Sequence, residues 1–315
     1  MSVSPTPTSQ SFRAGLGYGI AAYLMWGLFP LYWPLLKTSG EVSPAQAWNV
    51  SLEILSHRVV WSLGVVVVML AVVGKLRWFK TTEPSRLRAL VLAAALVSFN
   101  WLLYIWAVNT GHVVETALGY FINPLVSVLL GVFMLGERLR RAQWLVLGGA
   151  LVGVLVLAFD MGRPPWIALG LAPSFGLYGL VKKRAGIGAV ESLSFETAVL
   201  FPFALGWLVW LELSGTGRFA HASPTLNALF VGAGVLTAIP LVCFGAAANR
   251  IPLSMVGLLQ YIAPSLQFLC GVVLFHEAMS PGRWLGFGVL WASLGLFIAE
   301  GLWVQAKTKK VSPST

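Results

Sequence analysis

The chain has 315 residues, of which 57% are hydrophobic and only 10% are charged, and its mean hydropathy is +0.81. Soluble proteins are about one quarter charged, so this composition excludes a soluble globular protein and indicates an integral membrane protein. The net charge of +10 does not indicate nucleic-acid binding, because Lys and Arg form short clusters between apolar runs and no basic face carries interleaved aromatic residues.

The N-terminal residues 1–12 are polar and lack the basic start of a signal peptide. We expect them to be disordered and cytoplasmic. The apolar run after Arg13 is too long for a signal peptide, so we expect it to remain as the first membrane span.

Ten apolar segments can be marked along the chain, each near the length that crosses about 30 Å of hydrocarbon as a helix. They are residues 15–36, 50–73, 88–109, 113–135, 142–159, 165–182, 194–213, 226–248, 253–275 and 283–304. The connections between them are short, so we expect one helical bundle without a separate soluble domain.

The orientation of the spans follows from the basic residues, because loops that face the cytoplasm carry the excess of Lys and Arg. Sixteen of the 21 basic residues fall on one side of the predicted topology and four on the other, while Arg58 lies inside a span. Both termini are therefore predicted to be cytoplasmic, including the basic tail at 305–315.

One stretch occurs twice: residues 107–148 match residues 247–288 without a gap, with twelve of 42 positions identical. In each copy a proline, Pro124 or Pro264, falls near the middle of an apolar run, where it removes a backbone donor and frees a carbonyl four residues earlier. Interrupted helices at matching places in two half-repeats point to a transport site near the membrane midplane.

Five spans per half is an odd number, so the second half must cross the membrane upside down relative to the first. We place the first repeat at residues 13–160 and the second at residues 161–304. Pro124 and Pro264 are the expected hinges between them.

Four stretches resemble a known family: LEILSHRVVW (52–61), NWLLYIWAVN (100–109), LGYFINPL (118–125) and LGER (135–138). Together they are similar to the RarD family, the chloramphenicol-sensitivity group of the drug/metabolite transporter (DMT) superfamily, whose halves are EamA-type domains. The resemblance covers residues 13–303.

The resemblance implies an all-α integral membrane protein with ten transmembrane helices in two inverted five-helix EamA repeats. It also implies a multi-pass permease in the inner or plasma membrane of a bacterial cell. The segment at residues 37–52 is longer than the first external connection of the family, and this difference falls at the expected outer gate.

Polar side chains at membrane depth are costly unless they are paired or hydrated, so each one is a functional candidate. Around the two prolines the candidates for substrate binding are Tyr120, Asn123, Gln260, Tyr261 and Gln267. Helical spacing places two polar stripes on facing sides of the fourth and ninth spans. These stripes either line a cavity or join the two helices by hydrogen bonds.

Further candidates lie in three other spans. Asn100 and Tyr104, four residues apart in the third span, line a cavity or serve as interface residues. In the first span, Tyr23 and Trp26 are candidates, and Trp26-Gly27 aligns with Phe175-Gly176 of the sixth span, where Tyr178 follows. A matched aromatic-glycine pair allows close helix approach and a rocking joint.

Ionisable residues inside the spans are candidates for ion coupling. The spacing of Glu53 and His57 places them on one helical face, where the carboxylate could hold the imidazole or accept its proton. Arg58 either pairs structurally or handles protons or anions, and the repeat places Glu196 at its counterpart position. Glu137 is interpreted mainly as a group that fixes a helix end. We expect no metal site and no cofactor, and Cys243 and Cys270 are predicted to be free thiols.

These features predict a secondary active transporter that moves a small organic solute, with drug or metabolite export by alternating access. No G-x-x-x-x-G-K-[ST] motif is present, so the chain has no such element for ATP hydrolysis. A channel or a membrane sensor could use the same helices. An intramembrane enzyme is a weaker alternative, because Glu53, His57 and Arg58 lack a third oriented partner.

Overall fold

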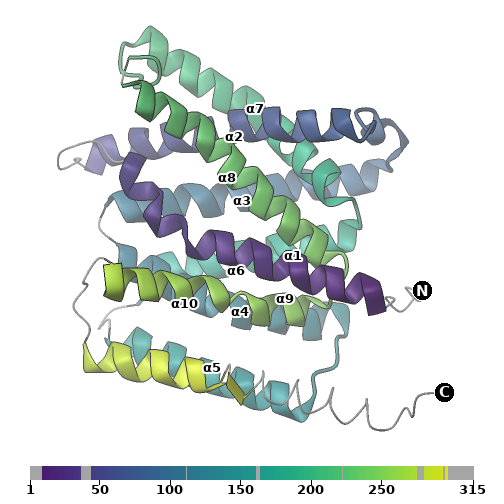
Figure 1. Ribbon diagram of the computed structural model, residues 1–315, viewed down its shortest axis with the longest axis vertical. Helices are drawn as coiled ribbons and strands as arrows, with labels where there is room; N and C mark the ends of the chain where they lie inside the picture. Colours follow the sequence, from purple (N-terminus) through teal and green to yellow (C-terminus); the bar gives the residue numbers. More distant parts are fainter. Residues whose placement is uncertain are drawn as a thin grey trace.

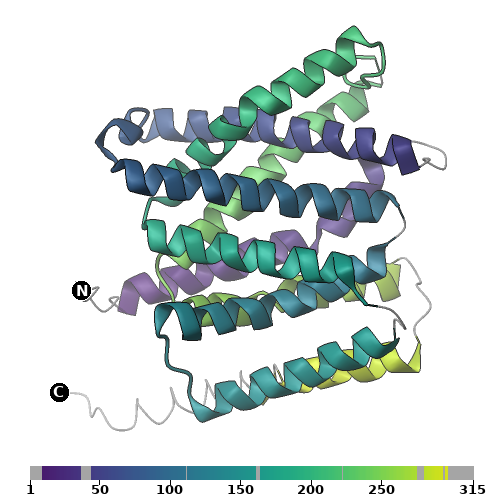
Figure 2. The same cartoon turned by 180° about the vertical axis from the view of Figure 1, so that it is seen from behind.

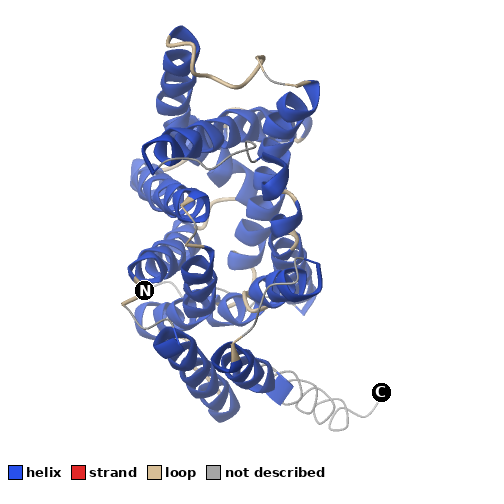
Figure 3. Ribbon diagram, turned by 90° about the vertical axis from the view of Figure 1, so that its left-hand side faces the viewer, coloured by secondary structure: helices blue, strands red, loops and turns tan. Residues whose placement is uncertain are grey.

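The computed structural model describes residues 9–36, 44–110, 112–160, 164–221, 223–274, 280–293 and 295–296, and these residues form helices, turns and short connections without a strand. Residues 1–8, the first part of the long segment at 37–52 (residues 37–43) and the basic tail at 305–315 lie outside the described residues. Figures 1 and 2 show the helices stacked on one another along the long axis of the molecule, most of them running across that axis. Figure 3 shows that the described elements are helices.

Among the described residues the helices lie at the predicted segments, of which the tenth, 283–304, is described only at 283–293 and 295–296. Their bounds are α1 Ser9–Gly27, α2 Pro44–Val72, α3 Pro84–Asn109, α4 Val113–Leu135, α5 Arg141–Asp160, α6 Trp166–Ala185, α7 Ala189–Leu213, α8 Pro224–Ala248, α9 Leu253–Leu259 and α10 Ile262–Leu269. A π-helical turn, η4 (Cys270–Leu274), continues α10, and residues 281–293 are also helical. Several helices begin where proline or glycine interrupts the preceding backbone pattern.

Seven helical stretches among the described residues are long and apolar enough to cross a membrane: α2, α3, most of α4, α5, α7, α8 and the run from α9 to η4. The chain is thus a multi-pass helical membrane protein. α6 is not among the seven, and its last turn carries Lys182, Lys183 and Arg184.

The first predicted segment, 15–36, is not one helix. α1 ends at Gly27, and two 3₁₀ turns follow, η1 (Phe29–Leu31) and η2 (Trp33–Leu36). Pro30 and Pro34 explain the change, because neither residue can donate the backbone hydrogen bond that an α-helix needs.

The two repeated prolines behave differently. Pro124 lies inside α4, which is helical on both sides of it, so the predicted interruption of this helix is wrong. At Pro264 the helix does break: α9 ends at Leu259, and Gln260 and Tyr261 form a turn before α10. This break includes Gln260, whose carbonyl has lost its partner at Pro264.

The two halves of the chain, residues 9–160 and 164–296, are interleaved. α4 packs against α6 and α9, α2 against α7 and α8, and α1 against α8 and α10. α3 also packs against α6 and α7, so the most extensive helix contacts join one half to the other. Figure 1 shows α5 with the helix at 281–293 at one end of this stack and α7 at the other.

Glycines allow the helices to approach closely at matching places. A Cβ on Gly27 of α1 would lie 2.7 Å from Leu266 of α10, and a Cβ on Gly176 of α6 would lie 2.7 Å from Val126 of α4. The close helix approach expected from the matched aromatic-glycine pairs is therefore present at both glycines.

Candidate functional site

An aromatic cluster lies where α1, α6 and α8 meet. The ring of Trp26 is 5.4 Å from Tyr23, 5.6 Å from Phe175 and 5.9 Å from Phe244, measured between ring centroids. Tyr178 stacks on Phe244 with an interplanar angle of 13°. Three of the predicted substrate-binding residues, Tyr23, Trp26 and Tyr178, are thus brought together from the two halves.

A buried ion pair adjoins this cluster. Lys182 Nζ lies 2.8 Å from Glu196 Oε1, with side-chain exposures of 3% and 1%. Tyr178 Oη donates to the other carboxylate oxygen, and Ser192 Oγ donates to Oε1. Three donors therefore surround the Glu196 carboxylate, and a buried charge with this arrangement is stabilised.

Lys182 is not among the predicted site residues, because in the sequence it is one of several basic residues at the end of a span. The spacing carried a usable signal: Tyr178 and Lys182 are four residues apart on α6, and Ser192 and Glu196 are four apart on α7. Residues four apart share a helix face, so each helix presents two of the four polar groups to the other.

Arg58 lies buried in α2, where it faces both halves. Its Nε donates to Thr237 Oγ1 of α8 at 3.0 Å, and its guanidinium carbon is 4.5 Å from the ring centroid of Trp101. Tyr104 and Tyr120, whose rings are 5.5 Å apart, lie near this guanidinium. Two predicted substrate-binding tyrosines are thus placed beside a cation at membrane depth.

The polar stripes of α4 and of the α9–α10 region do face each other. Gln260 Nε2 donates to Ser127 Oγ at 3.1 Å, so this pair joins the helices by hydrogen bonds. Gln267 Nε2 donates to the backbone oxygen of Trp26 on α1. The helices are close here, since a Cβ on Gly257 would lie 3.0 Å from the carbonyl oxygen of Pro124.

Three buried oxygens near this crossing make no hydrogen bond of good geometry in the structure: Asn123 Oδ1, Tyr261 Oη and Tyr23 Oη, the last of which lies beside the Gln260 side chain. Buried polar atoms are ordinarily paired, and an unpaired one often marks a functional site. All three belong to residues that the sequence predicted for substrate binding. Each can form a hydrogen bond with a solute or with water.

Asn100 has a different role. Its Nδ2 donates to the backbone oxygen of Leu171 and to Ser174 Oγ, both at 2.9 Å, so it joins α3 to α6. These bonds add a helix-joining contact that neither interpretation anticipated, and the substrate-binding role of Asn100 stays a prediction.

The expected pairing of Glu53 with His57 is wrong. Glu53 instead accepts hydrogen bonds from the backbone N and Nε of Arg218, at 2.8 and 2.6 Å. His57 accepts from Trp61 Nε1, packs 4.4 Å from the ring of Phe230, and leaves Nε2 unpaired and buried. A backbone N–H and a charged guanidinium N–H from the same residue bind the carboxylate better than a single neutral imidazole does.

Glu137 fixes a helix end, as its position suggested, but in the opposite half. Its two carboxylate oxygens accept from the backbone N–H groups of Leu253 and Ser254, at 2.7 and 2.8 Å, in the first turn of α9. A negative charge at a helix N-terminus is stabilised by the unpaired N–H groups and by the helix dipole.

Glu137→Gln is expected to reduce the free energy of unfolding by about 1–3 kcal/mol, because the neutral amide accepts only one of the two bonds well. Thermal unfolding in detergent measures the loss. Glu83→Gln is the control, since Glu83 precedes α3 without a side-chain capping bond and is 73% exposed. Equal stability of the two variants would contradict the capping role.

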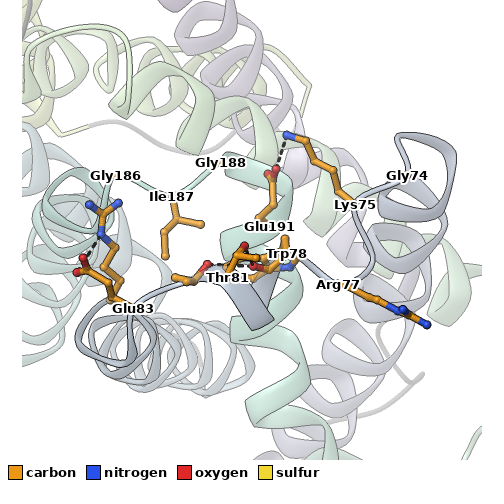
Figure 4. A pocket seen from close by; sticks show the side chains of 12 residues that line it. Gly74, Lys75, Arg77, Trp78, Thr81, Glu83, Gly186, Ile187, Gly188 and Glu191 are labelled. Atoms are coloured by element: carbon orange, nitrogen blue, oxygen red, sulfur yellow. Dashed lines mark hydrogen bonds and ion pairs between the residues drawn. The ribbon is translucent and has the colours of Figure 1, made fainter.

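Among the described residues no group of three or more His, Cys, Asp or Glu side chains could hold a metal ion. A cavity of about 700 Å³ lies away from the residues above, at the connection between α2 and α3, and is lined by Lys75, Trp78, Glu83 and Glu191 among others (Figure 4). None of the predicted substrate-binding residues lines it.

Comparison with known proteins gives the family. Residues 13–159 match the EamA-like transporter family. Protein RarD of Streptomyces exfoliatus is 53% identical over 92% of this chain and 90% of its own length, and Protein RarD of Escherichia coli (strain K12) is 40% identical over 95% and 98%. A solved crystal structure shares the fold, with a TM-score of 0.64 at 19% identity over 90% of this chain and 97% of that one. The chain belongs to the RarD group of EamA-like transporters, within the DMT superfamily.

Proposed function

We propose that this membrane transporter is a secondary active permease that exports a small organic solute by alternating access between two inverted repeats. The observation that carries the proposal is the set of buried, unpaired oxygens of Tyr23, Asn123 and Tyr261, which lie beside aromatic residues where the two halves meet. A solute that supplies the missing hydrogen-bond partners would be held between the moving parts.

Matched contacts support the inverted repeat, with halves at residues 13–160 and 161–304. Gly27 against Leu266 has its counterpart in Gly176 against Val126, with shifts of 149 residues for the glycines and 140 for their partners. The packing of α1 on α8 likewise corresponds to that of α6 on α3. Such pairs are expected when two related halves are joined by a two-fold axis in the membrane plane.

The proposed substrate site comprises residues from both halves. Aromatic rings of Trp26 and Tyr178 would stack on the solute, and Tyr104 and Tyr120 would present hydroxyls beside Arg58. The abundance of aromatic rings favours an aromatic or amphipathic solute, such as a drug or metabolite. A gradient would drive transport, with proton or ion coupling through His57, whose Nε2 is unpaired, or through Glu196.

The proposed location is the inner membrane of a bacterial cell with both termini in the cytoplasm. The excess of Lys and Arg on one side of the predicted topology supports this orientation. Pro264, which breaks the α9–α10 helix, and Pro124, which lies inside α4, are the proposed hinge positions.

Counterflow in proteoliposomes tests the function, with labelled chloramphenicol as the first probe and a metabolite panel after it. Saturable exchange is expected from the unmodified protein. Asn123→Ala and Gln260→Ala should each raise the solute concentration that gives half-maximal exchange by about tenfold, since loss of a buried hydrogen-bonding group costs about 1–3 kcal/mol.

Asn49→Ala, at an exposed position near the start of α2, is the matched control and should leave exchange unchanged. Non-saturable leak would indicate a channel, and conversion of the solute would indicate an enzyme. Full exchange by both site variants would remove Asn123 and Gln260 from the site.

A further inference from the structure

The cavity at the α2–α3 connection lies between the two halves. One wall comes from the first half, with Lys75, Trp78 and Glu83, and the other from Gly186, Ile187, Gly188 and Glu191 at the α6–α7 connection. Figure 4 shows the Lys75 side chain extending toward Glu191, while Arg77 points away. This face of the protein carries many of the basic residues in the predicted cytoplasmic loops.

An ion pair joins the halves at the edge of this cavity. Lys75 Nζ lies 2.7 Å from Glu191 Oε1, and the two side chains are 59% and 13% exposed. Directly behind it, the ring of Trp78 lies 6.3 Å from Phe195, one turn further along α7. Trp78 Nε1 also donates to Ser194 Oγ, so the indole holds the α2–α3 connection against α7.

A second ion pair joins the halves at the other end of α2. Arg218, in the connection that follows α7, lies 2.6 Å from Glu53 Oε2, and the two side chains are only 16% and 4% exposed. Phe219, the residue after Arg218, packs on His57, which is one turn further along α2; the two ring centroids are 4.8 Å apart.

The two arrangements correspond to each other through the repeat. Glu53 and His57 on α2 match Glu191 and Phe195 on α7, each with a shift of 138 residues, and both carboxylates pair with a basic residue just after the second helix of the opposite half. Glu53 and the end of α2 are 19 residues apart, which is about 30 Å of helix and close to the thickness of the hydrocarbon layer. The two pairs therefore lie near opposite membrane faces.

We propose that these ion pairs are the two gates of the transport path, and that the cavity of Figure 4 is its cytoplasmic vestibule. The Arg218–Glu53 pair is the outer gate. The more exposed Lys75–Glu191 pair, beside the vestibule, is the inner gate. This proposal rests on the transporter function and adds the residues that gate it. Alternating access requires that opening one gate favours closure of the other.

Gly188 supports a gating role for Glu191. A Cβ at position 188 would overlap the Glu191 carboxylate, so alanine there would push the carboxylate out of the position in which it meets Lys75. Gly188→Ala therefore displaces the carboxylate without removing its charge, and it serves as a second inner-gate variant beside Glu191→Gln.

The test measures side-specific labelling of two equivalent probe positions, Phe195→Cys and His57→Cys, in a background in which Cys243 and Cys270 are replaced by serine. A membrane-impermeant maleimide is added to right-side-out or inside-out vesicles. We expect Phe195→Cys to react from the cytoplasmic face faster than His57→Cys reacts from the outer face. Glu53→Gln should raise labelling of His57→Cys at least about fivefold and lower that of Phe195→Cys.

Glu191→Gln and Gly188→Ala should have the reverse effect, raising labelling at position 195 and lowering it at position 57. Glu212→Gln is the matched control, because Glu212 pairs with His221 within one half and both side chains are exposed. It should change neither rate. The gate proposal is overturned if Glu53→Gln and Glu191→Gln both leave labelling unchanged. It is also overturned if either of these two variants raises labelling at both probe positions.

Counterflow of the same labelled solutes separates this proposal from the function on which it rests. If counterflow is saturable while the gate variants label like the unmodified protein, the gates are wrong and the transporter function stands. If the reciprocal labelling is observed without counterflow of any probe, the gates stand and the transport assignment fails.

Discussion

Glu196→Ala is expected to reduce the free energy of unfolding by about 3–5 kcal/mol, the largest loss among the substitutions considered. The substitution removes a carboxylate that holds Lys182, Tyr178 and Ser192, and it leaves the ammonium of Lys182 buried at 3% exposure without its counter-charge. Removing one partner of a buried ion pair costs far more than the pair itself contributes. Thermal unfolding in detergent is the measurement.

A double variant separates the cost of an orphaned charge from the value of the pair. Lys182→Met with Glu196→Leu should recover most of the lost stability, because replacing both charges with apolar groups removes the buried ammonium as well. If the double variant is as unstable as Glu196→Ala, the cluster contributes directional bonds that apolar packing does not replace. Stability close to that of the unmodified protein in Glu196→Ala would contradict the burial of the pair.

Gly234→Ala should destabilise the protein by about 1–3 kcal/mol or more, through the crossing of α2 and α8. A Cβ at this position would lie 2.6 Å from the carbonyl carbon of Trp61 and 2.8 Å from the backbone N of Ser62. Backbone atoms cannot move aside as a side chain does, so the helices must separate. Thr237, one turn along α8, would then move away from Arg58.

The matched control for this crossing is Gly206→Ala, in α7. No atom lies within 4 Å of a Cβ at position 206, so alanine should be neutral or should stabilise the helix by about 0.5–1 kcal/mol. Comparison of the two unfolding temperatures isolates the effect of helix contact from that of helix propensity. Equal shifts in the two variants would show that α2 and α8 are not in backbone contact at Gly234.

The sequence predicts the helices well, because a run of apolar residues of membrane length allows hardly any other structure. α4 has the predicted bounds of 113–135, and α5 differs from its prediction by one residue at each end. The prediction for the first segment is wrong at its C-terminal end, where Pro30 and Pro34 lie and two 3₁₀ turns replace the α-helix. A hydropathy pattern does not distinguish a 3₁₀ turn from an α-helix, since the side chains are equally apolar.

The site was only partly predictable. Helical periodicity places Gln260 at the contact between the α9–α10 region and α4, where it bonds Ser127, because spacing of three or four defines a face. It does not reveal that Arg218 pairs with Glu53 over 165 residues, or that Glu137 caps α9. Those contacts depend on how the helices assemble, and local sequence carries no information about a partner in the other half.

The interleaving of the two halves has a consequence for biosynthesis. α1, α2 and α4 find their most extensive contacts in α6 to α10, all of which leave the ribosome later. Until then the first helices are inserted with their future contact faces against lipid, and buried groups such as Arg58 lack the α8 partner that later surrounds them. The newly made first half is thus expected to depend on the insertion machinery or on a chaperone until the second half follows. The two halves expressed as separate polypeptides should accumulate only when they are produced together.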